Sequence, residues 1–234
     1  MKFNNDMLRL YAVTDRHWTG EKTLYEQVRD VLMGGATCLQ LREKDLDEAS
    51  FYEEAKNIKE LCRLFDVPFI INDNVMLAKE IDADGVHVGQ DDMACVKARE
   101  ILGPDKIIGV SAHTIEEARI AKEQGADYLG VGAIFPTSSK DDAEVLGIKR
   151  LKEMTDTVDL PMVAIGGISY DNCLLLKDTG IDGIAVISAL FGQKNIKQAT
   201  IDLNKRVDAL YETMHTCLTI AGSDSSGGAG IQAD

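Results

Sequence analysis

The sequence predicts an α/β protein, a (β/α)8 TIM barrel, and three observations lead to this class. Eight short apolar runs rich in β-branched residues recur along the chain, and a helix-like stretch follows each of them. Similar turns, Gly-Ala-Thr at 35–37, Gly-Ala-Asp at 125–127 and Gly-Ile-Asp at 180–182, lead back into strands. The units lie between residues 8 and 212, a length near the ~250 residues typical of such barrels. A doubly wound sheet is the alternative.

The predicted strands leave room for one helix between neighbours, as parallel pairing requires. They are Leu8 to Val13, Thr37 to Leu41, Val67 to Ile71, Asp84 to Val88, Lys106 to Val110, Asp127 to Val131, Pro161 to Ile165 and Asp182 to Ile187. Apolar residues at steps of three and four predict helices between them, for example at Asp47 to Phe65, Thr114 to Gln124 and Tyr170 to Thr179. We assign residues 1–212 to one barrel domain.

Composition limits the class of protein and of partner. With 45% hydrophobic and 27% charged residues, the 234-residue chain has the make-up of a soluble globular protein with one large core. The N-terminus lacks a long apolar segment, and no run reaches ~18 apolar residues, so we expect a cytoplasmic protein without a membrane partner. A net charge of −14 argues against nucleic acid as the partner. Five scattered cysteines without a Cys-x-x-Cys pair predict neither a disulfide frame nor a zinc site.

The segment Gln40-Leu41-Arg42-Glu43-Lys44 carries the strongest indication of a ligand site. In a strand, positions 40, 42 and 44 share one face, while Leu41 points the other way, toward a covering helix. The polar face then lies at the carboxyl end of the barrel, where α/β proteins bind ligands. Arg42 and Lys44 suit an oligophosphate, and Gln40 can donate and accept hydrogen bonds. The alternative is a solvated salt-bridge cluster with the neighbouring carboxylates.

Carboxylates follow the third and fourth predicted strands. Asp73 and Asp92 come from adjacent strand ends and are placed to share a hard cation. Mg²⁺ typically takes one or two protein carboxylates together with substrate phosphate oxygens. The alternative for each segment is helix capping by Asx residues, a role that we assign to Asp91.

Hydroxyl groups follow the next two strands. Ser111 ends the fifth strand, whereas Thr114 followed by Glu117 predicts a capping box, and His113 receives no role. After the sixth strand, loop 135–142 carries three hydroxyls and a lysine. This composition is typical of a phosphate-gripping lid and also of a mobile surface loop.

Small residues follow the last two strands. Gly166-Gly167 comes after the seventh strand and Ser188 after the eighth. In many barrels these two loops bind a phosphate through backbone N–H groups, which small residues leave accessible. A Gly pair also suits a plain turn.

Together these segments resemble the thiamine-phosphate synthase family, also called thiamin phosphate pyrophosphorylase. The resemblance covers about residues 8–212. It rests on Gln40 to Lys44, Phe69-Ile70-Ile71-Asn72-Asp73, Gly85-Val86-His87-Val88-Gly89-Gln90-Asp91-Asp92, Gly109-Val110-Ser111, Gly132-Ala133-Ile134-Phe135-Pro136-Thr137 and Ile165-Gly166-Gly167-Ile168. The family's usual Thr-x-Thr-Lys stands here as Thr137-Ser138-Ser139-Lys140, which preserves the hydroxyl groups.

The resemblance implies a role for each matching residue. A pyrimidine diphosphate would be bound by Gln40, Leu41, Arg42, Glu43, Lys44, Asn72, Ser111 and Lys140. A thiazole phosphate would be bound by Thr137, Ser138, Ser139, Gly167, Ile187 and Ser188. Asp73 and Asp92 would hold Mg²⁺ as the cofactor, and catalysis would fall to Arg42, Lys44, Ser111 and Lys140.

The implied enzyme is a transferase for two small-molecule substrates. It joins 4-amino-2-methyl-5-(diphosphooxymethyl)pyrimidine to a thiazole phosphate carboxylate by a dissociative, Mg²⁺-assisted substitution, giving thiamine phosphate, pyrophosphate and CO2. Another phosphate-binding barrel, an isomerase, epimerase or aldolase, would not need Asp73 and Asp92 together with Arg42 and Lys44. A thiazole tautomerase or a regulatory relative would not need the pyrimidine diphosphate. The sequence leaves the oligomeric state open, a homo-oligomer included.

Residues 213–234 have a different character from the barrel. After a polar helical segment, residues 216–234 look like a strand running into a glycine-rich loop. They resemble the opening of hydroxymethylpyrimidine phosphate kinase, so we expect a linker and a truncated start of such a kinase-like domain, without kinase activity. A flexible Ser/Gly tail is the alternative.

Overall fold

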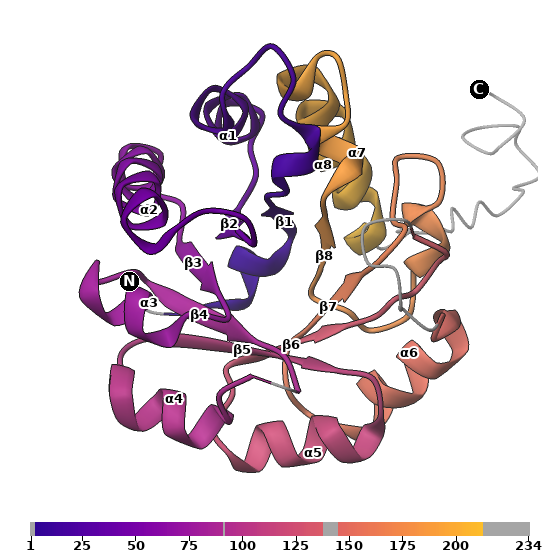
Figure 1. The fold of residues 1–234 in the computed structure, drawn as a ribbon. Coiled ribbons are helices and arrows are strands. Elements are labelled where there is room, and N and C mark those ends of the chain that lie inside the picture. Colours follow the sequence, from indigo (N-terminus) through magenta and orange to yellow (C-terminus); the bar gives the residue numbers. More distant parts are fainter. Residues whose placement is uncertain (1–2, 91, 138–144, 213–234) are drawn as a thin grey trace, which may run out of the picture.

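The structure, a computed structural model, describes residues 3–90, 92–137 and 145–212. Within these ranges eight parallel strands form a closed barrel with helices outside it (Figure 1). The strands are β1 Leu10–Val13, β2 Cys38–Leu41, β3 Phe69–Asn72, β4 Gly85–Val88, β5 Ile107–Ala112, β6 Tyr128–Val131, β7 Met162–Ile165 and β8 Gly183–Val186. β1 pairs with both β2 and β8, which closes the ring. The predicted barrel is confirmed, and the doubly wound alternative is excluded.

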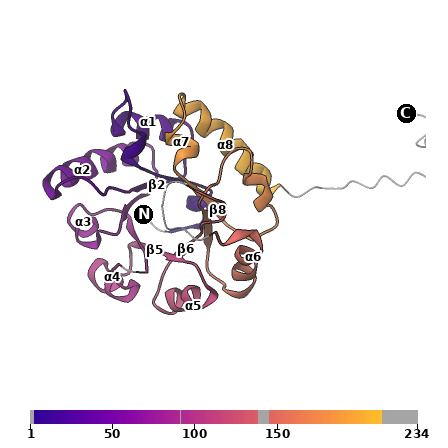
Figure 2. The same cartoon turned by 45° about the vertical axis from the view of Figure 1, so that its right-hand side comes forward.

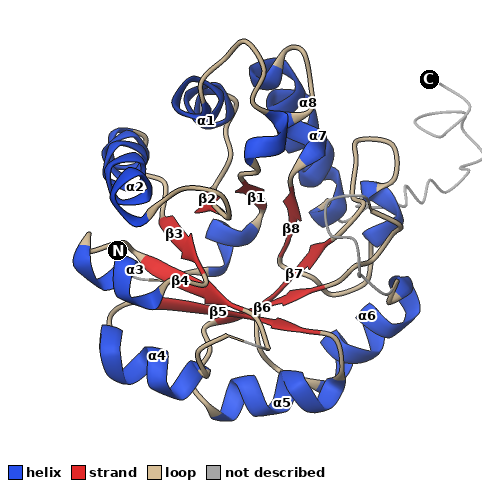
Figure 3. Ribbon diagram, viewed as in Figure 1, coloured by secondary structure: helices blue, strands red, loops and turns tan. Residues whose placement is uncertain are grey.

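The helices form a ring around the strands, as the turned view shows (Figure 2). They are α1 Leu24–Met33, α2 Glu48–Leu64, α3 Val75–Glu80, α4 Cys95–Leu102, α5 Ile115–Glu123, α6 Gly147–Thr157, α7 Ser188–Phe191 and α8 Ile196–Tyr211, with 3-10 turns η1 Asn5–Leu8, η2 Arg16–Trp18 and η3 Cys173–Leu176 (Figure 3). None of the helices in the described ranges combines the length and the apolar character that crossing a membrane requires.

The structure differs from the prediction in one helix and, by one or two residues, at most strand ends. The helix expected over Tyr170 to Thr179 is wrong, since this stretch holds only the short turn η3. Asn172 explains the difference: its side chain accepts a hydrogen bond from Ser169 N at 2.8 Å and donates one to Gly167 O at 2.8 Å. These bonds hold the chain in a loop instead of a first helical turn. Leu8, predicted to begin the first strand, ends η1.

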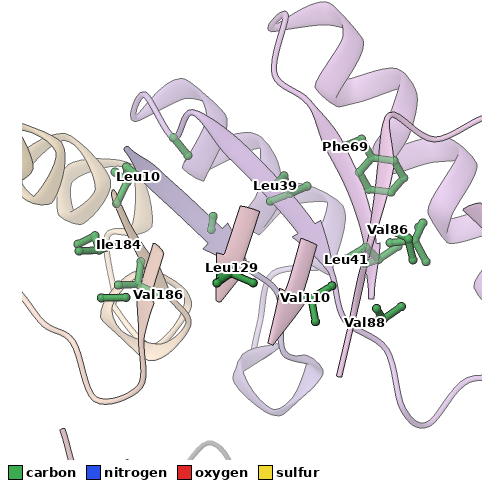
Figure 4. Close-up of a cluster of buried hydrophobic side chains, with 14 of the residues drawn as sticks. Leu10, Leu39, Leu41, Phe69, Val86, Val88, Val110, Leu129, Ile184 and Val186 are labelled. Atoms are coloured by element: carbon green, nitrogen blue, oxygen red, sulfur yellow. The ribbon is translucent and has the colours of Figure 1, made fainter. Parts of the chain in front are cut away.

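Two apolar layers, one outside the strands and one inside, stabilise the barrel. The outer layer lies between strands and helices and contains Leu39 and Leu41, as the strand alternation predicts (Figure 4). The inner layer contains Tyr11, Ile70 and Tyr128 from separate strands. Because the inner layer fills the barrel below the strand ends, a ligand has room at the carboxyl ends, where the polar residues lie.

Candidate active site

A cavity of about 400 Å³ lies at the carboxyl ends of the strands. The predicted site residues that line it are Gln40, Arg42, Asn72, Ser111, Thr137, Gly167, Ile187 and Ser188. They come from both sets of residues that the sequence assigns to two different substrates. The fold therefore brings these two sets together in one space, while Ser138, Ser139 and Lys140 lie outside the described residues.

A charged cluster of Lys44, Asp73 and Asp92 lies next to the cavity residues Arg42 and Asn72. Lys44 Nζ donates a hydrogen bond to Asp73 Oδ2 at 2.7 Å. Asp92 Oδ2 accepts one from Gly89 N at 2.7 Å. Partial desolvation and then the adjacent Asp73 carboxyl raise the pKa of Asp92, although much of its side chain is exposed. Two carboxylates this close repel each other when both are ionised, so a cation between them would relieve the repulsion.

The backbone around Asp73 directs its carboxylate to this cluster. Asp73 has a φ of 61°, in the left-handed region that residues other than glycine seldom adopt. Its N–H donates to His87 O at 2.8 Å, which fixes the turn against β4. Asn74, not Asp73, caps α3, since its Oδ1 accepts from Leu77 N at 2.9 Å. The helix-capping alternative therefore does not account for Asp73, while Asp91 lies outside the described residues.

The donor chemistry of this pair fits Mg²⁺. Within the described ranges, no group of three or more His, Cys, Asp or Glu side chains is placed to hold a metal ion. Mg²⁺ is usually bound by one or two carboxylates and takes its other ligands from water and substrate phosphates. Asp73 and Asp92 supply such a pair beside a cavity with room for a phosphate-bearing substrate.

Besides Lys44, which belongs to the charged cluster, two predicted binding residues have side chains that do not line the cavity. Leu41 is fully buried in the outer layer. The Glu43 side chain is 2% exposed and accepts from Arg16 Nε at 2.7 Å and from the N–H groups of Lys44 and Asp45 at 2.9 Å. Burial raises the pKa of Glu43, but these hydrogen bonds outweigh burial and lower it. Both side chains therefore have structural contacts, and the part of these two residues in substrate binding stays a prediction.

The ion pairs of this region argue against the alternative that Arg42 and Lys44 form a salt-bridge cluster with the neighbouring carboxylates. Arg16 also pairs with Glu54 at 2.6 Å, so Glu43 is engaged with η2 and α2. Arg42 approaches Asp15 at 3.5 Å, and Lys44 pairs with Asp73. The two predicted phosphate-binding cations are therefore not paired with their sequence neighbours.

Three cavity residues that the sequence analysis did not assign, Tyr11, His87 and Tyr128, link Gln40 to Ser111. Gln40 Nε2 donates to Tyr11 OH at 2.9 Å, and the two phenol oxygens are 2.7 Å apart. His87 Nδ1 lies 3.1 Å from Tyr128 OH, and His87 Nε2 lies 3.0 Å from Ser111 Oγ. A continuous hydrogen-bonded chain thus crosses the floor of the cavity.

Burial controls the ionisation of this chain. It lowers the pKa of His87 to about 4, against the opposing effect of the Asp92 carboxylate. It also raises the pKa of Tyr11 and of Tyr128 well above the usual value. At neutral pH the chain therefore consists of neutral groups.

At the opposite side of the cavity, Gly167 lets two loops approach closely. It has a φ of 64°, and a Cβ there would lie 2.8 Å from Phe135 O and would also meet Pro136 O. Glycine is needed at this point because a side chain would push the loop after β6 away from the loop after β7. Thr137 and Ser188 border the same region, where a second hollow of about 340 Å³ adjoins the cavity.

The mouth of the cavity between β5 and α6 holds His113, Thr114 and Arg150. Thr114 Oγ1 accepts from Glu117 N at 3.1 Å, as predicted. The Glu117 carboxylate, however, accepts from His113 N at 2.7 Å, so the reciprocal half of the predicted capping box is directed to the preceding residue. Arg150 lies on α6, far in sequence from any strand end. Its position along the chain therefore gives no indication that it lines the cavity.

Comparisons with known proteins agree with this geometry. A family model described as thiamine monophosphate synthase matches residues 10–190. The thiamine-phosphate synthase of Clostridium acetobutylicum is 49% identical over 189 residues, covering 81% of this chain and 90% of that protein. That of Methanobrevibacter smithii is 48% identical over 206 residues, covering 88% and 98%. The solved thiamine phosphate pyrophosphorylase of Pyrococcus furiosus matches with a TM-score of 0.83 and 43% identity, covering 89% of this chain and 99% of that one. The chain therefore belongs to the thiamine-phosphate synthase family.

Proposed function

We propose that this chain is a thiamine-phosphate synthase that couples 4-amino-2-methyl-5-(diphosphooxymethyl)pyrimidine to a thiazole phosphate carboxylate. The observation that carries this proposal is the single cavity bordered by Arg42 and Asn72 on one side and by Gly167 and Ser188 on the other. A synthase must hold two phosphate-bearing substrates with their reacting atoms in contact, and a shared cavity meets that need.

The diphosphate is assigned to the side of the cavity that carries the cations. Departure of pyrophosphate leaves positive charge on the pyrimidine methylene and builds negative charge on the leaving group. Arg42 and Lys44, with Lys140 from the loop outside the described residues, would stabilise that negative charge. Asp73 and Asp92 would hold Mg²⁺, which when bound supplies further charge neutralisation at the leaving pyrophosphate. These cations would also offset the overall charge of −14.

The thiazole phosphate is assigned to Thr137, Gly167, Ile187 and Ser188, with Ser138 and Ser139 from the same loop as Lys140. Its ring nitrogen would attack the methylene cation, and loss of CO2 would complete the aromatic ring of the product. Water at the methylene would trap the cation first, so both substrates must fill the cavity before the C–O bond breaks.

The decisive experiment incubates the purified chain with both substrates and Mg²⁺ and measures thiamine phosphate by chromatography. Parallel reactions omit the pyrimidine diphosphate or contain excess chelator. Turnover of the thiazole substrate without the pyrimidine would favour a tautomerase. Activity undiminished by chelator would remove the magnesium assignment, whereas a complete reaction that yields no thiamine phosphate would favour another kind of phosphate-binding barrel.

The remaining proposals concern the setting of the enzyme. We propose residues 1–212 as the synthase barrel and residues 213–234, which lie outside the described residues, as a linker and the start of a kinase-like domain. Synthase activity should then be equal in the full chain and in a version ending at Thr216, and a large loss would make the segment part of the barrel.

We also propose a cytoplasmic enzyme with small-molecule partners and without a nucleic-acid partner.

A further inference from the structure

We propose that Gln40, Tyr11, Tyr128 and His87 form a one-way hydrogen-bond chain that sets the Ser111 hydroxyl as a donor into the cavity. Tyr11, Tyr128 and His87 are then positioning residues, which act on a substrate through Ser111. The direction of the chain is a property of the protein itself. Its use, donation from Ser111 to the diphosphate, rests on the proposed function.

The direction follows from counting protons along the chain. The Nε2 nitrogen of the Gln40 amide can only donate a hydrogen bond, so the hydroxyl oxygen of Tyr11 accepts that bond at 2.9 Å. The proton of Tyr11 is then available for Tyr128 oxygen, 2.7 Å away. Once Tyr128 accepts from Tyr11, its own proton is available for His87 Nδ1 at 3.1 Å.

The His87 ring extends the same donor-to-acceptor direction from Tyr128 to Ser111 on β5. The ring nitrogens face two hydroxyls, those of Tyr128 and Ser111, and neither partner is an anion that would favour a second proton on the ring. A neutral imidazole has one donor and one acceptor nitrogen. Acceptance at Nδ1 therefore places the proton on Nε2, which donates to Ser111 Oγ at 3.0 Å.

The consequence at Ser111 matches the ligand chemistry. Because Ser111 oxygen accepts from His87, its own proton does not point to the ring and is available to the cavity that Ser111 lines. Phosphate oxygens are hydrogen-bond acceptors, so an anionic ligand requires a donor at this place. The Ser111 main-chain oxygen accepts from Gln90 Nε2 at 2.6 Å, which holds the end of β5 in position.

The opposite direction is a distinct and testable state. It requires the Gln40 amide to be turned over, so that its oxygen accepts from Tyr11, and every later bond then reverses. His87 would carry its proton on Nδ1, and Ser111 would donate to the ring instead of to a ligand. The two states differ in which ring nitrogen of His87 is protonated.

The tautomer can be read in the free protein by long-range 1H–15N NMR of chains labelled at the histidine rings. The chain has four histidines, and the resonances that vanish in His87→Gln identify His87. We expect the proton on Nε2 and a bare Nδ1 at neutral pH. A proton on Nδ1, or on both nitrogens, would overturn the proposal. This measurement needs no substrate, so it stands or falls apart from the proposed function.

Two tyrosine variants separate positioning from packing. Tyr128→Phe removes the donor to His87 Nδ1, so we expect a mixture of His87 tautomers. We also expect kcat to fall about tenfold, as the loss of one oriented hydrogen bond allows, with an unchanged KM for the thiazole phosphate. Tyr11→Phe removes the link through which Gln40 sets the direction, so it should also give a mixture of His87 tautomers and a lower kcat. Tyr211→Phe is the matched control, since it removes a buried phenol hydroxyl that takes no part in the chain, and it should keep the Nε2 proton and normal activity. An unchanged tautomer in both Tyr11→Phe and Tyr128→Phe would contradict the proposal.

A pair of substitutions at His87 tests the donor to Ser111. The amide N–H of His87→Gln can replace Nε2–H, whereas His87→Leu has no polar atom. We expect His87→Gln to retain several-fold more kcat than His87→Leu, with both variants folded by near-UV circular dichroism. Equal kcat values for the two would contradict donation from His87 to Ser111.

Discussion

Lys44 donates a 2.7 Å hydrogen bond to Asp73, so a cation assigned to the diphosphate lies directly against a carboxylate assigned to the metal. The contact joins the end of β2 to the end of β3 at the edge of the cavity. It also places positive charge where the carboxylates of Asp73 and Asp92 would otherwise repel each other. The substrate and metal assignments are therefore physically coupled, and each can be tested through the other.

The metal assignment predicts that Asp73→Ala or Asp92→Ala lowers turnover by about 100-fold or more, the loss expected when a group that organises transition-state charge is removed. Thiamine phosphate formation is measured over a range of Mg²⁺ concentrations, and circular dichroism checks the fold. Asp105→Ala, an exposed carboxylate that precedes β5, is the control and should keep normal activity. Full activity in either site variant would remove the assignment.

The cation assignment predicts a difference between the two ligands. Arg42→Ala and Lys44→Ala should weaken pyrimidine diphosphate binding by about 10- to 100-fold, since hydrogen bonds to charged groups contribute ~1.5–3 kcal/mol. Thiazole phosphate binding should change much less. Calorimetric titration of each ligand measures both, with Lys97→Ala on α4 as an exposed control. Equal losses for the two ligands would mean that these cations act through the general field or through folding.

Gly167→Ala should destabilise the protein and weaken binding of the thiazole phosphate. Alanine at a φ of 64° costs on the order of 1 kcal/mol, and the contacts with Phe135 O and Pro136 O add to this. Thermal melting and titration with the thiazole phosphate measure the two effects. Gly20→Ala is a matched control, because a Cβ there meets no atom within 4 Å. A Gly167→Ala variant as stable as wild type would contradict the close approach of the two loops.

The sequence predicts this site well where function depends on position along a strand. The eight strand ends are fixed by short apolar runs, and closure of the barrel then brings Arg42, Asn72, Ser111 and Ser188 to one cavity. No long-range contact has to be guessed, because the carboxyl ends of parallel strands share one face of the barrel. The order of strands and loops along the chain is therefore enough to predict that these four residues meet.

What the sequence analysis did not assign depends on contacts across the barrel. Tyr11 and Tyr128 lie within apolar strands and have the pattern of core residues, and their hydroxyls meet only because β1 and β6 face each other inside the ring. The structural role of the Glu43 side chain likewise depends on its hydrogen bond from Arg16, which is 27 positions away in the chain. Periodicity indicates that a side chain points inward or outward, but it does not indicate which partner it meets.

The buried ring of His87 predicts an acid-dependent loss of stability. The pKa of His87 is about 4 in the folded protein, against an ordinary value of 6.5. Below pH 6.5 the imidazole of the unfolded chain therefore binds a proton, while that of the folded chain stays neutral until the pH approaches 4. The contribution of His87 to stability is complete above pH 6.5, declines as the pH falls toward 4, and changes no further below that. Thermal melts across this range should fall less steeply for His87→Gln, which has no group that titrates there. Ser111→Ala is the control, since it removes a partner of the ring but keeps the imidazole, and it should retain the steep decline. Parallel curves for wild type and His87→Gln would mean that burial does not lower the pKa of this ring in the folded protein.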